Sequence, residues 1–194
     1  MASQSEIKYN RLVEKAEMLF IQFGYKAVSV DEISEAAGIS KMTIYKYFDS
    51  KETLFIEVML LLMDRQYNLI EAKLNDISGT LEKINFMMNY SLEGAKDYSL
   101  ALYKDIMNIP HITERLIAVK NEKNKVLFES MIREGMEKGE VKRGDVVFMA
   151  DMIIMMIEAF GQRHFYKINN REDLEGLTKS LFDFLKYGLL GGGA

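Results

Sequence analysis

The sequence predicts an all-α protein with an N-terminal three-helix helix-turn-helix domain and a larger C-terminal helical domain. The 194-residue chain contains one Pro and 14 Met, and it is rich in Leu, Glu and Lys, which favour helices. Apolar residues recur every three or four positions, and no alternating stretch predicts a strand. We expect residues 1–50 to form the first domain and residues 51–194 to form the second.

A first helix is predicted to end at Gly24. Its apolar residues recur at helical spacing and share one face, and Gly is the usual residue just past a helix end. The residues on this face are Leu12, Ala16, Leu19, Phe20 and Phe23.

Serine residues predict the starts of the next three helices. Ser29, with Glu32 three residues later, fits an N-terminal capping box, and Gly38 ends the helix that follows. Ser40 can cap a third helix, and Ser50 a long fourth one. Two short helices joined by a three-residue turn that contains Gly form a helix-turn-helix.

The third helix is predicted to bury one face and expose the other. At about 100° per residue, Ile44 and Phe48 face inward, where they join Ile33, Ala37 and Ile39 in a small core. Lysines neutralise phosphates, hydroxyl groups hydrogen-bond phosphate oxygens, and an outward helix face fits the major groove of DNA. The same pattern alone also fits a solvated face or a helical module that binds a protein. The outward and edge residues are Lys41, Met42, Thr43, Tyr45, Lys46, Tyr47 and Lys51.

The charge of the chain opposes DNA binding overall but favours it locally. The formal net charge is −4, whereas DNA-binding domains are usually basic. Residues 38–51 nevertheless contain three lysines and a single acidic residue, Asp49. The positive charge is therefore confined to the predicted DNA-binding surface.

The run FGYKAVSVDEISEAAGISKMTIYKYFDSKETLF, residues 23–55, resembles the DNA-binding pattern of the tetracycline repressor (TetR) family. The resemblance implies a homodimer that binds a palindromic operator and holds a small-molecule pocket in its C-terminal domain. It also implies that Ser29 and Ser40 contact phosphates and that Tyr47 and Lys51 anchor the DNA backbone. The residues implied to approach bases are Lys41, Met42, Thr43 and Tyr45.

Met42 departs from the family pattern, which usually has a small residue at this position. We expect this departure to change the base sequence that the helix prefers, for example through contact with a thymine methyl group.

The C-terminal domain carries weaker signals. An apolar helix at about 145–167 has two apolar faces, which predicts burial on both, and a helix at about 172–190 repeats Leu and Phe at similar spacing. These two helices fit the dimer contact that the resemblance implies, a four-helix bundle across a two-fold axis, in which Gly161 allows close approach. The remaining helices are predicted at about 54–75, 80–95, 98–108 and 111–138.

An effector site is predicted among aromatic residues and methionines of the C-terminal domain. Methionine adapts to irregular apolar shapes, which suits a pocket for an apolar or amphipathic molecule, although Met at helical spacing also fits plain core. Such a ligand would release a repressor from its operator; an activator of the same family is the alternative. The residues are Tyr90, Tyr103, Met107, Phe128, Met152, Met156 and Phe160.

Composition argues against several other classes. The chain has no Cys and two distant His residues without metal-ligand spacing, and it lacks a Gly-rich phosphate loop, so we expect no metal, no cofactor and no enzyme. The N-terminus lacks the apolar segment of a signal peptide, and the longest apolar run is shorter than a membrane span. We expect a cytoplasmic protein.

Overall fold

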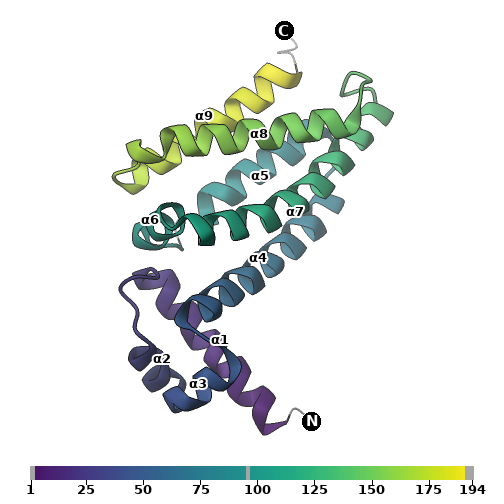
Figure 1. Ribbon diagram of the computed structural model, residues 1–194. Coiled ribbons are helices and arrows are strands. Elements are labelled where there is room, and N and C mark those ends of the chain that lie inside the picture. Colours follow the sequence, from purple (N-terminus) through teal and green to yellow (C-terminus); the bar gives the residue numbers. More distant parts are fainter. Residues whose placement is uncertain (1–2, 95–96, 191–194) are drawn as a thin grey trace. The chain divides into compact units, whose positions relative to one another are not determined.

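The computed structural model describes residues 3–94 and 97–190, and every regular element in these ranges is a helix (Figure 1). The all-α prediction is confirmed. The predicted helix at 145–167 ends earlier, because its last three residues, Phe165–Lys167, form a 3-10 helix. The last residue of the helix predicted at 80–95, residue 95, lies outside the described ranges. The α-helices are α1 Gln4–Phe23, α2 Val30–Ala37, α3 Lys41–Tyr47, α4 Lys51–Asn75, α5 Thr80–Gly94, α6 Leu100–Asn108, α7 Pro110–Glu137, α8 Val146–His164 and α9 Arg171–Leu190.

The chain folds into two compact units, which we call unit 1 and unit 2. Unit 1 comprises Met1–Arg65 and Asp97–Ile117, and unit 2 comprises Gln66–Lys96 and Ala118–Ala194. Helices α4 and α7 contribute residues to both units. Ser50, the last residue of the predicted DNA-binding domain, caps α4 by accepting a hydrogen bond from the backbone N–H of Thr53 at 3.1 Å.

Unit 1 has an aromatic core. The rings of Phe20 and Phe55 meet edge to face at a centroid distance of 4.9 Å, and both side chains are fully buried. Ile33, Ala37 and Ile44 are buried as predicted, with Phe48 beside them and Ile39 partly buried against the same cluster. Phe23, the last residue of the predicted helix face, is 46% exposed, because α1 ends there and the chain turns away at Gly24.

Gly24 is required by both conformation and space. It ends α1 with a φ of +85°, which L side chains rarely adopt. A Cβ atom at this position would lie 2.8 Å from a carboxylate oxygen of Asp105 and 3.0 Å from the backbone carbon of Ala101. Helix α6 therefore packs directly on the end of α1, within unit 1.

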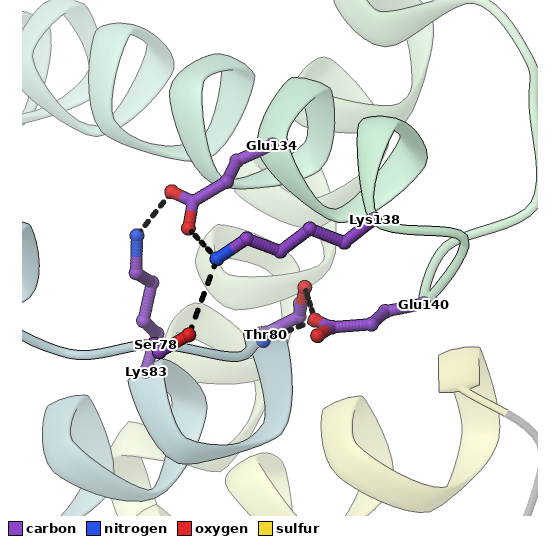
Figure 2. Close-up of polar contacts among 6 residues, drawn as sticks. All are labelled: Ser78, Thr80, Lys83, Glu134, Lys138 and Glu140. Atoms are coloured by element: carbon purple, nitrogen blue, oxygen red, sulfur yellow. Dashed lines mark hydrogen bonds and ion pairs between the residues drawn. The ribbon is translucent and has the colours of Figure 1, made fainter.

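Unit 2 combines an apolar core with a polar network, and Figure 2 shows the polar network. Phe128 and Ile132 of α7 pack with Ala150 and Ile154 of α8 in a cluster separate from that of unit 1. At the start of α5, the carboxylate of Glu140 accepts hydrogen bonds from the backbone N–H and the hydroxyl of Thr80, at 2.6 and 2.9 Å.

The second half of this network pairs charges. Glu134 binds the buried Lys83 and, at 2.6 Å, Lys138, which also donates to Ser78. The pairs fix the α4–α5 connection to the end of α7.

No helix in the described ranges is long and apolar enough to cross a membrane.

Candidate DNA-binding interface

The turn between α2 and α3 is built from the residues that predicted it. Ser29 accepts a hydrogen bond from the backbone N–H of Glu32, whose carboxylate binds the N–H of Ser29 at 2.7 Å, so the capping box is confirmed. Gly38 takes the left-handed conformation that ends α2. Ser40 then caps α3 through the N–H of Thr43. These contacts fix the angle at which α3 leaves the turn.

Helix α3 buries one face and presents the other to solvent. Ile44 is 1% exposed, whereas Met42 is 75% and Tyr45 is 51% exposed. Lys46 is also exposed and forms no ion pair with any residue that the structure describes. We call the exposed side chains of Met42, Tyr45 and Lys46, together with Lys41, the recognition surface. Its orientation agrees with the face predicted from helical spacing.

Two polar side chains in the first turn of α3, Lys41 and Thr43, already have partners. The ammonium group of Lys41 forms an ion pair with Asp31 of α2. The hydroxyl groups of Thr43 and Ser40 lie 2.9 Å apart and share a hydrogen bond. Base contact by Lys41 or Thr43 would have to compete with these bonds, whereas Met42 and Lys46 are unconstrained by such contacts within the described residues.

The predicted backbone anchors also have internal partners. The Tyr47 hydroxyl donates to the carbonyl oxygen of Ser5 at 3.0 Å, which ties α3 to the start of α1. Lys51 donates to the carbonyl oxygens of Tyr25 and Val28 at 2.8 and 2.9 Å, with its nitrogen 4.2 Å from the Tyr25 ring centroid. Burial lowers the pKa of Lys51, opposed by the negative charges of Asp105 and Glu32. An ammonium group has three N–H donors, so one remains available for a phosphate.

Sequence reasoning missed the residues that hold the loop before α2. Asp105 of α6 is buried and accepts a hydrogen bond from the backbone N–H of Lys26 at 2.8 Å. The loop is therefore held by Asp105 of α6 as well as by Lys51 of α4. Arg11 donates to the carbonyl oxygen of Gly38 at 3.3 Å and supports the turn itself. The Asp105 contact joins residues 79 positions apart, and no local pattern signals it.

The predicted effector residues are divided between the two units. Tyr103 and Met107 lie on α6 in unit 1, and the other five lie in unit 2. Phe128 is in the core of unit 2, and Met152 is 38% exposed. The ring of Phe160 lies 4.6 Å from that of His164, whose Nδ1 atom is buried without a hydrogen-bond partner among the described residues.

An open hollow of about 340 Å³ lies between α5 and α9, and none of the predicted effector residues lines it. Four of the six residues that line it are charged: Leu92, Glu93, Glu172, Glu175, Gly176 and Lys179. In the described part of the chain, no group of three metal-ligating side chains converges.

Taken together, the capped turn and the outward face of α3 define a helix-turn-helix DNA-binding domain. Residues 12–58 match the model of the bacterial regulatory proteins of the tetR family. The chain belongs to the TetR family of helix-turn-helix transcriptional regulators, which are DNA-binding proteins and not enzymes.

The similarity to known proteins extends over most of the chain. A fatty acid metabolism regulator protein of Bacillus subtilis is 24% identical over 96% of this chain and 97% of the relative. The transcriptional repressor KstR2 of Mycolicibacterium smegmatis is 23% identical over 72% of this chain and 70% of the relative. The crystal structure of FadR from Bacillus subtilis in complex with stearoyl-CoA has a TM-score of 0.65 at 20% identity, covering 96% of this chain and 100% of the other.

Proposed function

We propose that this protein is a cytoplasmic repressor that binds a palindromic operator as a two-fold homodimer and is released by an apolar or amphipathic small molecule. The observation that carries this proposal is a pair of exposed surfaces, one in each unit: the recognition surface of α3 and an apolar face on α8 and α9. A DNA-binding dimer requires both, because two recognition helices must reach major grooves about 34 Å apart.

The apolar face on α8 and α9 supports the dimer. On α8, Phe148 and Met155 are 62% and 59% exposed and lie on the same side as Met152. On α9, Phe184 and Tyr187 are 56% and 58% exposed, one helical turn apart. A second copy of the chain would cover this face in a four-helix bundle. Gly161 lies about 120° around α8 from Met155, so the bundle does not depend on it.

Two features support an amphipathic effector in unit 2. The apolar ring of Phe160 lies 4.6 Å from that of His164, and Met156 precedes Phe160 by about one helical turn. The Nδ1 atom of His164 is buried without a partner among the described residues, and a buried polar atom needs one. A ligand with an apolar body and a polar group would contact the apolar side chains and also supply a hydrogen-bond partner for the Nδ1 atom. Met152 fits the exposed apolar face better than this proposed effector site, and Phe128 fits the core better.

The relative that binds stearoyl-CoA supplies the first ligand to try. Operator affinity would be measured by fluorescence anisotropy during a titration with stearoyl-CoA. We expect it to fall by about 5- to 150-fold, which is the usual range of coupling between two sites. Because coupling is reciprocal, operator DNA must weaken ligand binding by the same factor, as measured by calorimetry. Equal ligand affinity with and without operator would contradict release by this ligand.

A substitution locates the effector site. Met156→Glu should abolish ligand binding, because a carboxylate would be placed against the apolar part of the ligand. Leu69→Glu, at a side chain of unit 2 that is 55% exposed, is the matched control and should leave ligand affinity unchanged. Unchanged affinity in Met156→Glu would place the site elsewhere.

In vitro transcription from a promoter with the operator distinguishes repression from activation.

A further inference from the structure

Met42 is the most exposed of the large apolar side chains that the structure describes. It is 75% exposed and occupies the second position of α3, in the first turn of the helix. The N-terminal residues of a recognition helix are the ones that contact base edges in helix-turn-helix proteins. Its position therefore places an apolar side chain where base contacts are made.

The side chains on either side of Met42 already form polar contacts within the protein. Lys41 is paired with Asp31, and the Thr43 hydroxyl shares a hydrogen bond with Ser40. Met42 has no comparable constraint, and an unbranched thioether side chain adapts its shape to a surface. Among these three neighbouring residues, Met42 can approach a base without breaking an existing contact.

The chemistry of the major groove limits what Met42 can recognise. Every base edge in the major groove carries hydrogen-bond donors or acceptors, and the C5 methyl of thymine is the apolar group that the groove presents. A thioether cannot donate a hydrogen bond and accepts one only weakly. Packed against a polar edge, it would remove water from donors or acceptors without replacing their hydrogen bonds, which is costly. Packed against a methyl group, it buries apolar surface on both sides.

We propose that Met42 is a specificity-determining residue that packs against the C5 methyl group of one thymine in each operator half-site. This inference rests on the proposed two-fold operator for the number of thymines, one per half-site. It goes beyond that proposal by assigning the base and the atom of the base that is recognised.

The test uses selected DNA in which single methyl groups are removed. The full chain would first select its preferred duplex from a random pool. Each thymine would then be replaced by deoxyuridine, which keeps the base pairing but lacks the C5 methyl. We expect one position per half-site to respond, with affinity falling about fourfold for one half-site and about fifteenfold for both, from the free energy of burying a methyl group.

A substitution identifies the side chain that senses the methyl group. In Met42→Ala, thymine and deoxyuridine at the responsive position should bind equally well. Met18→Ala is the matched control, because Met18 is also exposed, at 56%, but lies on α1; it should keep the full response. Alanine is a good helix former, so neither variant should disturb its helix.

Three results would overturn the inference. A selected duplex in which no thymine responds would do so, as would a response that persists unchanged in Met42→Ala. Selection that enriches no sequence would also contradict it, because the helix would then read no base. In that case, binding to unselected DNA in the same assay shows whether the DNA-binding function has failed as well.

Discussion

Units 1 and 2 differ in the kinds of side chain that their helices expose. In unit 1, α3 buries Ile44 and exposes a small mixed surface of Met42, Tyr45 and lysines. In unit 2, the large apolar side chains that α8 and α9 expose include Phe148, Met152, Met155, Phe184 and Tyr187. A surface that is mixed and locally positive suits a polar, charged partner such as DNA, whereas exposed apolar helix faces suit a second copy of the same helices.

The apolar face of α8 can be broken with one charge. Met155→Glu would place an unpaired carboxylate on each side of the two-fold axis, which costs about 3–5 kcal/mol per buried charge. We expect a monomer in light scattering at micromolar concentration and a loss of operator affinity of more than about 100-fold. Leu69→Glu adds the same charge to an exposed position of α4 and should remain dimeric. A dimeric Met155→Glu would show that α8 does not form the interface.

The buried side of unit 1 should respond through stability instead. Phe55 is fully buried between Phe20 and Tyr25, with both ring centroids at 4.9 Å. Phe55→Ala should lower the free energy of unfolding by about 3–5 kcal/mol, measured by urea denaturation and circular dichroism. Phe148→Ala, compared in the monomeric Met155→Glu background, should change it by less than about 0.5 kcal/mol. Equal losses would mean that the two positions are equally buried in the monomer.

A third prediction separates backbone anchoring from base recognition within unit 1. Lys51→Ala should weaken binding to all duplexes and reduce the slope of log affinity against log salt by about 0.9, the value for one phosphate contact. Tyr45→Ala should instead change which sequence is preferred. Fluorescence anisotropy at several salt concentrations measures both. An unchanged affinity and salt slope in Lys51→Ala would exclude the phosphate contact.

Lys51→Ala also removes the two hydrogen bonds to the loop before α2. Asp105→Asn is a useful comparison, because it weakens the acceptor of the Lys26 N–H in the same loop without touching a DNA contact. It should lower stability and leave the salt slope unchanged. The two variants together distinguish loss of a phosphate contact from displacement of the loop.

The smallest expected effect is a pH dependence in unit 2. Hydrogen bonds from Lys138 and Lys83 lower the pKa of Glu134, and those from Thr80 lower the pKa of Glu140. At acidic pH the unfolded chain therefore binds more protons than the folded chain, so stability rises with pH there. Stability from these groups is present above pH 4.5, their ordinary pKa, and is lost as the pH falls through the lowered values.

Substitution of one partner tests this network. In Glu134→Gln, the dependence of the urea midpoint on pH between about 3 and 5 should be shallower than in the native chain. Glu71→Gln, on the exposed surface of α4, should leave that dependence unchanged. An identical pH profile for Glu134→Gln and the native chain would contradict the assigned role of Glu134.

Local signals predicted unit 1 well because the decisive interactions there are short in sequence. The capping box of Ser29 and Glu32 and the end of α2 at Gly38 each depend on residues within a few positions. The contact of Asp105 with the Lys26 backbone could not be predicted, since it depends on how α6 packs.

The exposure of the outer face of α8 was harder to predict, for a different reason. Apolar residues at helical spacing look the same whether their face packs in a core or against a second chain. The sequence predicts that both apolar faces of this helix are buried, yet Val147 is 45% exposed in the single chain. Likewise, nothing in the spacing of Tyr103 and Met107 assigned them to unit 1 rather than to unit 2.

The central claim, that two copies of α3 contact one operator together, is tested most directly by the stoichiometry of the complex. Analytical ultracentrifugation of the chain with its selected duplex measures the mass at saturation. We predict two chains per duplex, bound cooperatively, and loss of this complex in Met155→Glu. One chain per duplex at saturation, with full affinity and sequence preference, would contradict the account.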